Sequence, residues 1–109
     1  MNAGVGNFYK IGRLDDFVEG IGQKIKIKRE AIAVFKHRGK IFAFQNACPH
    51  QNADLAEGYI RNMKIYCRHH HWSFDLESGA YVFNPSLSLK IYPVHLVNGN
   101  VYLEINKDR

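Results

Sequence analysis

The sequence has no long apolar run, few cysteines and few prolines, and these shortages limit what the protein can be. No stretch approaches the roughly 18 to 20 apolar residues that a membrane-spanning helix needs. The opening residues, MNAGVGNFYKIGRLDDF, have neither the basic nor the apolar segment of a secretory signal. With 109 residues, the chain is expected to form one domain, 1–109, in the cytoplasm and not in a membrane.

Only two cysteines are present, and a histidine follows each of them closely. Cys48-Pro49-His50 and Cys67-Arg68-His69-His70 together offer two thiolates and two imidazoles as metal ligands. This is the ligand set of a Rieske [2Fe–2S] centre, in which two histidines replace two cysteines on one iron. A structural zinc ion also accepts two cysteines and two histidines, although zinc motifs usually group Cys with Cys and His with His. Two cysteines committed to a metal leave none for a disulfide, which suits a reducing compartment.

The residues around both motifs resemble the two cluster-binding loops of Rieske ferredoxins. The stretch CPHQNADLAEG at 48–58 is similar to the first loop, and CRHHHWSFDLESG at 67–79 is similar to the second. The resemblance implies one Rieske-type [2Fe–2S] cluster. The ligands it implies are Cys48, His50, Cys67 and His70. In the family the two histidines lie nearest the solvent, so they would form the exit path for the electron.

Residues 69–71 are all histidine, which makes the register of the second motif ambiguous. The Cys-x-x-His spacing selects His70, and the two neighbouring histidines are expected to be solvated or packed against the loop. His37 and His95 fall in strand-like segments and are expected to be surface or core residues without a ligand role.

Alternating and apolar stretches predict an all-β protein. Strict alternation at 23–28 predicts a strand with one buried face. Asn98-Gly99 is a strong signal for a tight hairpin turn, and residues 37–40, between two apolar runs, are expected to form a second hairpin. A short helical turn is expected within 15–19. The expected strands cover 23–28, 31–35, 41–44, 92–97 and 101–105. With the resemblance, they predict the Rieske fold, a small antiparallel β-sandwich or barrel with a cluster-binding lobe inserted at about 46–78.

The implied function is electron transfer, and the chain is not expected to be an enzyme by itself. Sulfide, thiolate and imidazole fill every iron position of a Rieske centre, so no open position remains for a substrate. The resemblance implies a soluble one-electron carrier between an NAD(P)H-dependent flavoprotein reductase and a terminal oxygenase. The alternative is the small subunit of a complex of the NAD(P)H nitrite reductase type. A complete Rieske oxygenase is not expected, because its mononuclear iron domain would need a far longer chain.

The chain is basic, with a net charge of +5 and a pI of about 9.3. This charge predicts redox partners with acidic docking surfaces. Arg61, Lys64 and Arg68 fall in or beside the expected lobe and could steer such a partner, or they could be ordinary solvated side chains. Nucleic-acid binding is not expected, because lysines alternate along one strand and no recognition module is present.

The resemblance also bears on the reduction potential. In quinol-oxidising relatives, a serine two residues after the second histidine ligand and a tyrosine four residues after it donate hydrogen bonds to the cluster. Trp72 and Phe74 stand at these positions here, and neither has a hydroxyl group. Hydrogen bonds to cluster sulfur stabilise the reduced state, so their absence predicts a low potential, near the roughly −150 mV end of the Rieske range.

Overall fold

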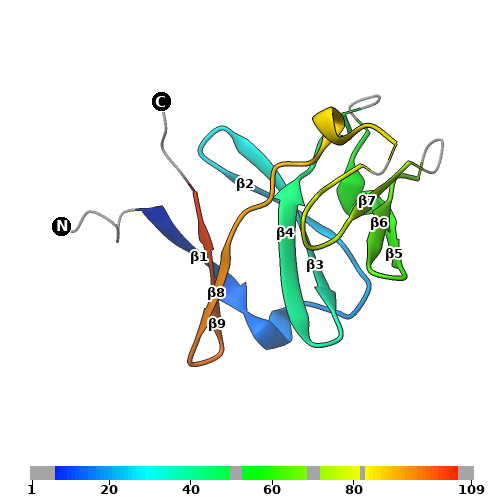
Figure 1. The fold of residues 1–109 in the computed structure, drawn as a ribbon. Helices are drawn as coiled ribbons and strands as arrows, with labels where there is room; N and C mark the ends of the chain where they lie inside the picture. Colours follow the sequence, from blue (N-terminus) through cyan, green and yellow to red (C-terminus); the bar gives the residue numbers. More distant parts are fainter. Residues whose placement is uncertain (1–6, 50–52, 69–71, 82, 106–109) are drawn as a thin grey trace.

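The computed structural model describes residues 7–49, 53–68, 72–81 and 83–105, and strands dominate it (Figure 1). The strands are β1 (Phe8–Arg13), β2 (Gln23–Ile27), β3 (Glu30–His37), β4 (Lys40–Gln45), β5 (Tyr59–Arg61), β6 (Lys64–Tyr66), β7 (Ser73–Asp75), β8 (Val94–Val97) and β9 (Asn100–Glu104). Three short 3-10 helices are η2 (Leu14–Asp16), η3 (Leu55–Glu57) and η4 (Pro85–Leu87). Within these ranges there is no α-helix, and no helix is long and apolar enough to cross a membrane.

The strands form three antiparallel sheets of three strands each, in the orders β1-β9-β8, β2-β3-β4 and β5-β6-β7. The all-β, antiparallel prediction is therefore confirmed. The first two sheets make the base of the molecule, and the third belongs to a separate lobe (Figure 1).

Both predicted hairpins are present, and their turns explain why. Arg38 and Gly39 connect β3 to β4 with φ angles of 54° and 78°. Asn98 and Gly99 connect β8 to β9 with φ angles of 52° and 81°. Two-residue turns with positive φ at both positions match the right-handed twist of the flanking strands. The register of each hairpin is thereby fixed by its turn residues.

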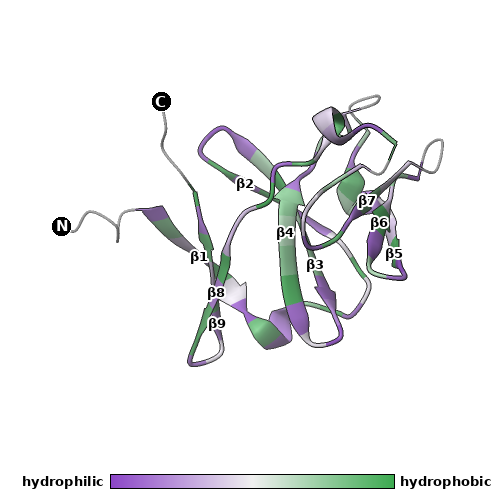
Figure 2. Ribbon diagram, in the orientation of Figure 1, coloured by the Kyte–Doolittle hydropathy of each residue, from purple (hydrophilic) through white to green (hydrophobic). Residues whose placement is uncertain are grey.

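The alternation of β2 places its lysines outward and its isoleucines toward the base core, and the ribbon of β2 accordingly alternates between purple and green in Figure 2. Its neighbour β3 is the central strand, and its residues 32–35 are all fully buried. A central strand that is covered on both faces is expected to be continuously apolar, and the segment Ile32-Ala33-Val34-Phe35 has this character.

Strand β1 was not predicted, because the sequence FYKIGR has no clear alternation. It pairs with β9, and the register shifts between Lys10 and Gly12, where Gly12 has a φ of 149°. A β-bulge of this kind breaks the period-two pattern on which strand prediction depends. The predicted helical turn within 15–19 appears as η2, which begins one residue earlier, at Leu14.

The lobe is an excursion of the chain from the edge of β4. The backbone N–H of Gln45 donates to the carbonyl of Lys90 at 2.9 Å, and that of Tyr92 donates to Ala43 at 3.0 Å. The chain thus leaves β4 and returns to the same strand edge. The predicted lobe boundaries of about 46–78 enclose all of β5, β6 and β7, while the return segment also packs into the lobe core through Leu89.

Two clusters of buried residues hold the molecule together. One lies in the base, between the first two sheets, and includes Ile32, Val34 and Val101. The other joins base to lobe and includes Phe35 and Phe44 from the base and Phe74 from the lobe. Burying such side chains stabilises each by about 1.5–3 kcal/mol relative to exposure. Because the second cluster takes residues from both parts, the lobe is packed against the end of the sheet.

A close backbone approach within the lobe generates a first prediction. A Cβ atom at Gly58 would lie 2.2 Å from the carbonyl oxygen of Tyr66, so Gly58→Ala must displace β6 or the turn before β5. The expected loss is about 1–3 kcal/mol of unfolding free energy. Glu57→Ala, at the exposed neighbouring position, should change it by less than about 0.5 kcal/mol. Urea denaturation measures both, and equal stability of the two variants would contradict the tight approach.

Candidate metal centre

Two loops carrying the cysteines close in the same way. The backbone N–H of Cys48 donates to the carbonyl of Ala53 at 2.9 Å, and that of Cys67 donates to the carbonyl of Trp72 at 2.7 Å. In each case the bond joins a cysteine to the residue five positions later. His50 and His70 fall inside these two closed loops by sequence, and both lie outside the described residues. Their role as ligands therefore stays a prediction.

The two cysteines lie in one apolar environment. Cys48 is fully buried, Cys67 is 1% exposed, and both belong to the cluster of buried residues that joins base and lobe. Neither forms a disulfide. A thiolate in such surroundings requires compensation, because burial in an apolar environment disfavours the charged form. A metal ion supplies that compensation, so the donor set fits a cluster whose inner iron is held by these two thiolates.

Other histidines are placed away from this centre. His37 ends β3, and His95 lies in β8, where its Nε2 atom is 3.2 Å from Oε1 of Glu104. Among the described residues, no group of three or more His, Cys, Asp or Glu side chains could hold a metal ion. The described residues by themselves therefore do not form a site with three or more such ligands.

A polar network supports the first cysteine loop, and the sequence analysis did not identify it. Apart from aromatic residues and cysteines, Asn46 is the one buried polar residue in the described ranges, with 3% of its surface exposed. Its Nδ2 donates to Oδ1 of Asp54 at 2.7 Å, and its Oδ1 accepts from the backbone N–H of Ala56 at 3.0 Å. Its own backbone donates to Ala31 and accepts from Leu55. Asn46 thus ties the start of the loop to its end and to β3.

Asp54 completes this network at the surface. Lys24 donates to its Oδ2 atom at 3.1 Å. This hydrogen bond, followed by the one from Asn46, holds the pKa of Asp54 below its ordinary value. Asp54 is therefore ionised in the folded protein at neutral pH, and its charge draws Lys24 to the first loop.

Aromatic side chains support the second loop. Trp72 stacks on Tyr81 with ring centroids 4.3 Å apart and an interplanar angle of 4°. Phe74 is fully buried, and the centroid of its ring lies 5.5 Å from that of Tyr81. Trp72 also provides the carbonyl that closes the loop, so the stack fixes the residue on which loop closure depends.

A turn after β7 completes this support. The carboxylate of Asp75 accepts from the backbone N–H and the hydroxyl of Ser78, and from the backbone N–H of Glu77. The bond from the Ser78 backbone contributes most to lowering the pKa of Asp75. The DLESG segment after the strand is therefore a structural turn, which returns the chain toward Tyr81.

The three basic residues singled out in the sequence do not form one group around the loops. Arg61 and Lys64 face each other across the β5–β6 hairpin. Lys64 begins β6, whereas Cys67 follows the end of that strand, three residues and about 10 Å further on. Of the three, only Arg68 adjoins a cysteine.

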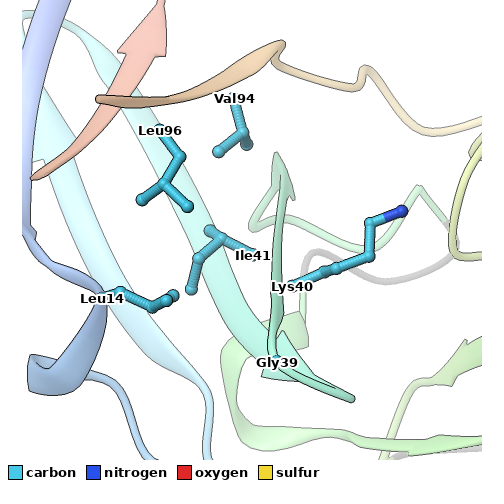
Figure 3. A pocket seen from close by; sticks show the side chains of 6 residues that line it. All are labelled: Leu14, Gly39, Lys40, Ile41, Val94 and Leu96. Carbon is cyan, nitrogen blue, oxygen red and sulfur yellow. The ribbon is translucent and has the colours of Figure 1, made fainter. Parts of the chain in front are cut away.

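A cavity of about 200 Å³ lies far from the cysteines in the fold, between the start of β4 and β8. Figure 3 shows Leu14, Ile41, Val94 and Leu96 pointing toward one another, while the side chain of Lys40 extends away from them. The lining has no thiol, imidazole or carboxylate. This cavity therefore offers no ligands for a metal centre.

Comparisons with known proteins agree with the sequence resemblance. A family model described as the Rieske [2Fe-2S] domain matches residues 7–93. The 3-phenylpropionate/cinnamic acid dioxygenase ferredoxin subunit of Photorhabdus laumondii is 32% identical over 98 residues, covering 88% of this chain and 92% of the relative. The ferredoxin component of the naphthalene 1,2-dioxygenase/salicylate 5-hydroxylase systems of Ralstonia sp. is 31% identical over 100 residues, covering 91% and 96%.

A solved structure of a Mycobacterium tuberculosis protein, assigned as the small subunit of an NADH-dependent nitrite reductase, superposes with a TM-score of 0.86. It covers 93% of this chain and 96% of its own, with 17% sequence identity. At that identity the similarity concerns the fold alone. It confirms the predicted fold class.

The network around Asn46 gives the second prediction. In Asn46→Asp, two carboxylates would face each other where the amide now donates to Asp54 at 2.7 Å. Mutual repulsion raises the pKa of the pair in the folded state above the roughly 3.9 of an unfolded aspartate. The variant should therefore be destabilised at pH 7 to 8, and the penalty should shrink as the pH falls toward 4.

Urea denaturation of the variant and the parent protein at pH 8 and pH 5 measures this difference. Asn46→Ala is the matched control: it leaves the N–H of Ala56 without its partner, which should cost about 1–3 kcal/mol at both pH values. A pH-independent loss in Asn46→Asp would show that Asn46 and Asp54 do not interact as described.

Proposed function

This chain belongs to the Rieske [2Fe–2S] domain family, and we propose that it is the ferredoxin component of an oxygenase system, with a cluster held by two cysteines and two histidines. The proposed ligands are Cys48, His50, Cys67 and His70. The observation that carries the proposal is the pair of buried cysteines, each at the start of a loop closed by the same backbone hydrogen bond. When bound, the cluster supplies one-electron redox chemistry.

The residues of the chain hold and insulate the centre. The buried thiol positions of Cys48 and Cys67 keep water from the inner side, among the side chains of Phe44, Leu55 and Phe74. The histidine positions belong to the outer parts of the same loops in the family, where a partner can approach. A buried inner side and an approachable outer side suit electron exchange between proteins.

The ferredoxin role is supported by the relatives. Two of them, above 30% identity and matched over most of their length, are named as ferredoxin components of dioxygenase systems. We therefore propose a terminal oxygenase as electron acceptor and an NAD(P)H-dependent flavoprotein reductase as donor. The small-subunit role in a nitrite reductase remains the alternative, and co-purification with a large subunit would favour it.

The third prediction tests the ligand set. Protein purified without oxygen should contain two iron atoms and two labile sulfides per chain, as a [2Fe–2S] centre requires. His70→Ala should abolish both iron and labile sulfide, whereas His69→Ala and His71→Ala, which flank it, should retain them. Iron and sulfide analysis with visible absorption measures the outcome. Stoichiometric zinc without labile sulfide would contradict the assignment. Retention of iron and labile sulfide in the His70→Ala variant alone would contradict it too.

The fourth prediction concerns the reduction potential. Phe74 carries no hydroxyl and lies among the residues that surround both cysteines. Phe74→Tyr should raise the midpoint by tens of millivolts, because a hydrogen bond is worth about 1 kcal/mol and about 59 mV corresponds to 1.4 kcal/mol for one electron. Protein-film voltammetry measures the midpoint. Phe42→Tyr, which adds the same group on β4, should leave it unchanged within about 10 mV. A parent midpoint above about +100 mV would contradict the predicted low potential.

A further inference from the structure

A hollow of about 440 Å³, lined largely by charged residues, lies beside the first cysteine loop, on the outer face of β2. Its lining includes three cations, Lys24, Lys26 and Arg29. The opposite wall is formed by Asn46, Ala47 and Asp54, from the two ends of the loop that begins at Cys48.

We propose that this hollow is the docking site for a carboxylate-bearing surface segment of the redox partner. The inference rests on the proposed function and adds to it the place where the partner binds. It places the basic docking surface on the β2 side of the first cysteine loop, and not at the group of Arg61, Lys64 and Arg68 that the sequence suggested.

The charge balance of the hollow supports an anionic occupant. Lys24 is paired with Asp54 at 3.1 Å. Lys26 and Arg29 are both exposed, and in the described part of the chain neither forms an ion pair. Three cations against one carboxylate leave an uncompensated positive charge, which attracts carboxylates and orients an approaching partner.

The position of the hollow relates it to the redox centre. Ala47 immediately precedes Cys48, and Asp54 immediately follows Ala53, the residue that closes the loop. The hydrogen bonds from Lys24 to Asp54 and from Asn46 to Asp54 connect the hollow to the base of that loop. A segment seated here lies against Ala47 and Asp54, which flank the first cysteine loop, so docking would bring the partner beside the base of that loop.

The construction of the hollow favours a protein surface over a small anion. Its cations stand on an exposed strand and turn, and its buried polar side chain, Asn46, already bonds to Asp54 and Ala56. No described buried donor is thus left to hold a single phosphate. A segment with several carboxylates can instead contact Lys26 and Arg29 together. The competing explanation is that the lysines only protect β2, an edge strand, from pairing with other chains.

The first experiment measures electron transfer with a charged probe. The reduced holoprotein is oxidised by ferricyanide in a stopped-flow instrument, for the parent, for Lys26→Glu/Arg29→Glu and for a control, Lys10→Glu/Lys40→Glu. The control makes the same change in net charge at exposed lysines of β1 and at the far end of β4. At about 20 mM salt the rate should fall about fivefold or more in the first variant and less than about twofold in the control.

Near 300 mM salt the two variants should react at similar rates, because the Debye length is then below about 10 Å. Equal losses of oxidation rate in both variants at low salt would show that only the net charge matters, and would overturn the proposal. A cationic cobalt complex as oxidant should give the reverse order, with the first variant faster than the control.

The second experiment reads binding without electron transfer. Hexaglutamate and inorganic phosphate are titrated at equal ionic strength into isotope-labelled protein, and amide shifts of Lys26, Arg29 and Ala31 are followed by NMR. Hexaglutamate should shift these amides in the parent and the control, and not in Lys26→Glu/Arg29→Glu. Equal shifts with phosphate would show a small-anion site, and no shift with either would favour strand protection; both overturn the proposal. Zinc in place of iron would contradict the proposed function while leaving this titration readable.

Discussion

The lobe depends on the chain leaving and rejoining one strand edge. Gln45 donates to Lys90 and Tyr92 donates to Ala43, so both ends of the excursion are fixed to β4. Because the two ends are fixed, the cysteine loop that follows Gln45 begins from a rigid strand. A site built from the end of a strand is held more precisely than one on a free loop. The packing of Leu89 into the lobe core secures the return path.

The cysteines are placed where base and lobe share one core. Cys48 lies shortly after β4, where the chain enters the lobe, and Cys67 follows β6 within the lobe; both are packed with the same apolar residues. Binding of a metal by these two residues would therefore tie the start of the lobe to β6 by coordination as well as by packing. Metal binding by deprotonated thiolates and folding are coupled in such sites. Stability of the lobe and retention of the cofactor should accordingly respond to the same substitutions.

Both the net charge of the protein and the positions of its basic side chains affect how it attracts a partner. The net charge of +5 describes the whole chain, yet its basic side chains are distributed unevenly. Arg61 and Lys64 stand at the far end of the β5–β6 hairpin, and Lys64 faces Asp75 across β6 and β7. Lys26 and Arg29 stand beside the first cysteine loop, and in the described ranges neither of them forms an ion pair. Proximity to the centre, rather than the number of charges, decides which of them can guide a partner.

The sequence by itself determined the cysteine and histidine motifs, the hairpins at Asn98-Gly99 and Arg38-Gly39, and the alternation of β2. These are local signals, because spacing, turn residues and side-chain period act over a few residues. The tertiary structure decided what required residues distant in the chain. It paired β1 with β9 despite the bulge at Gly12, and it buried Asn46, whose type is usually exposed, because Asp54 and Ala56 satisfy its amide. It also placed Arg61 and Lys64 at one end of the β5–β6 hairpin and Cys67 after the other end of β6. Composition alone does not show in which direction a strand such as β6 runs.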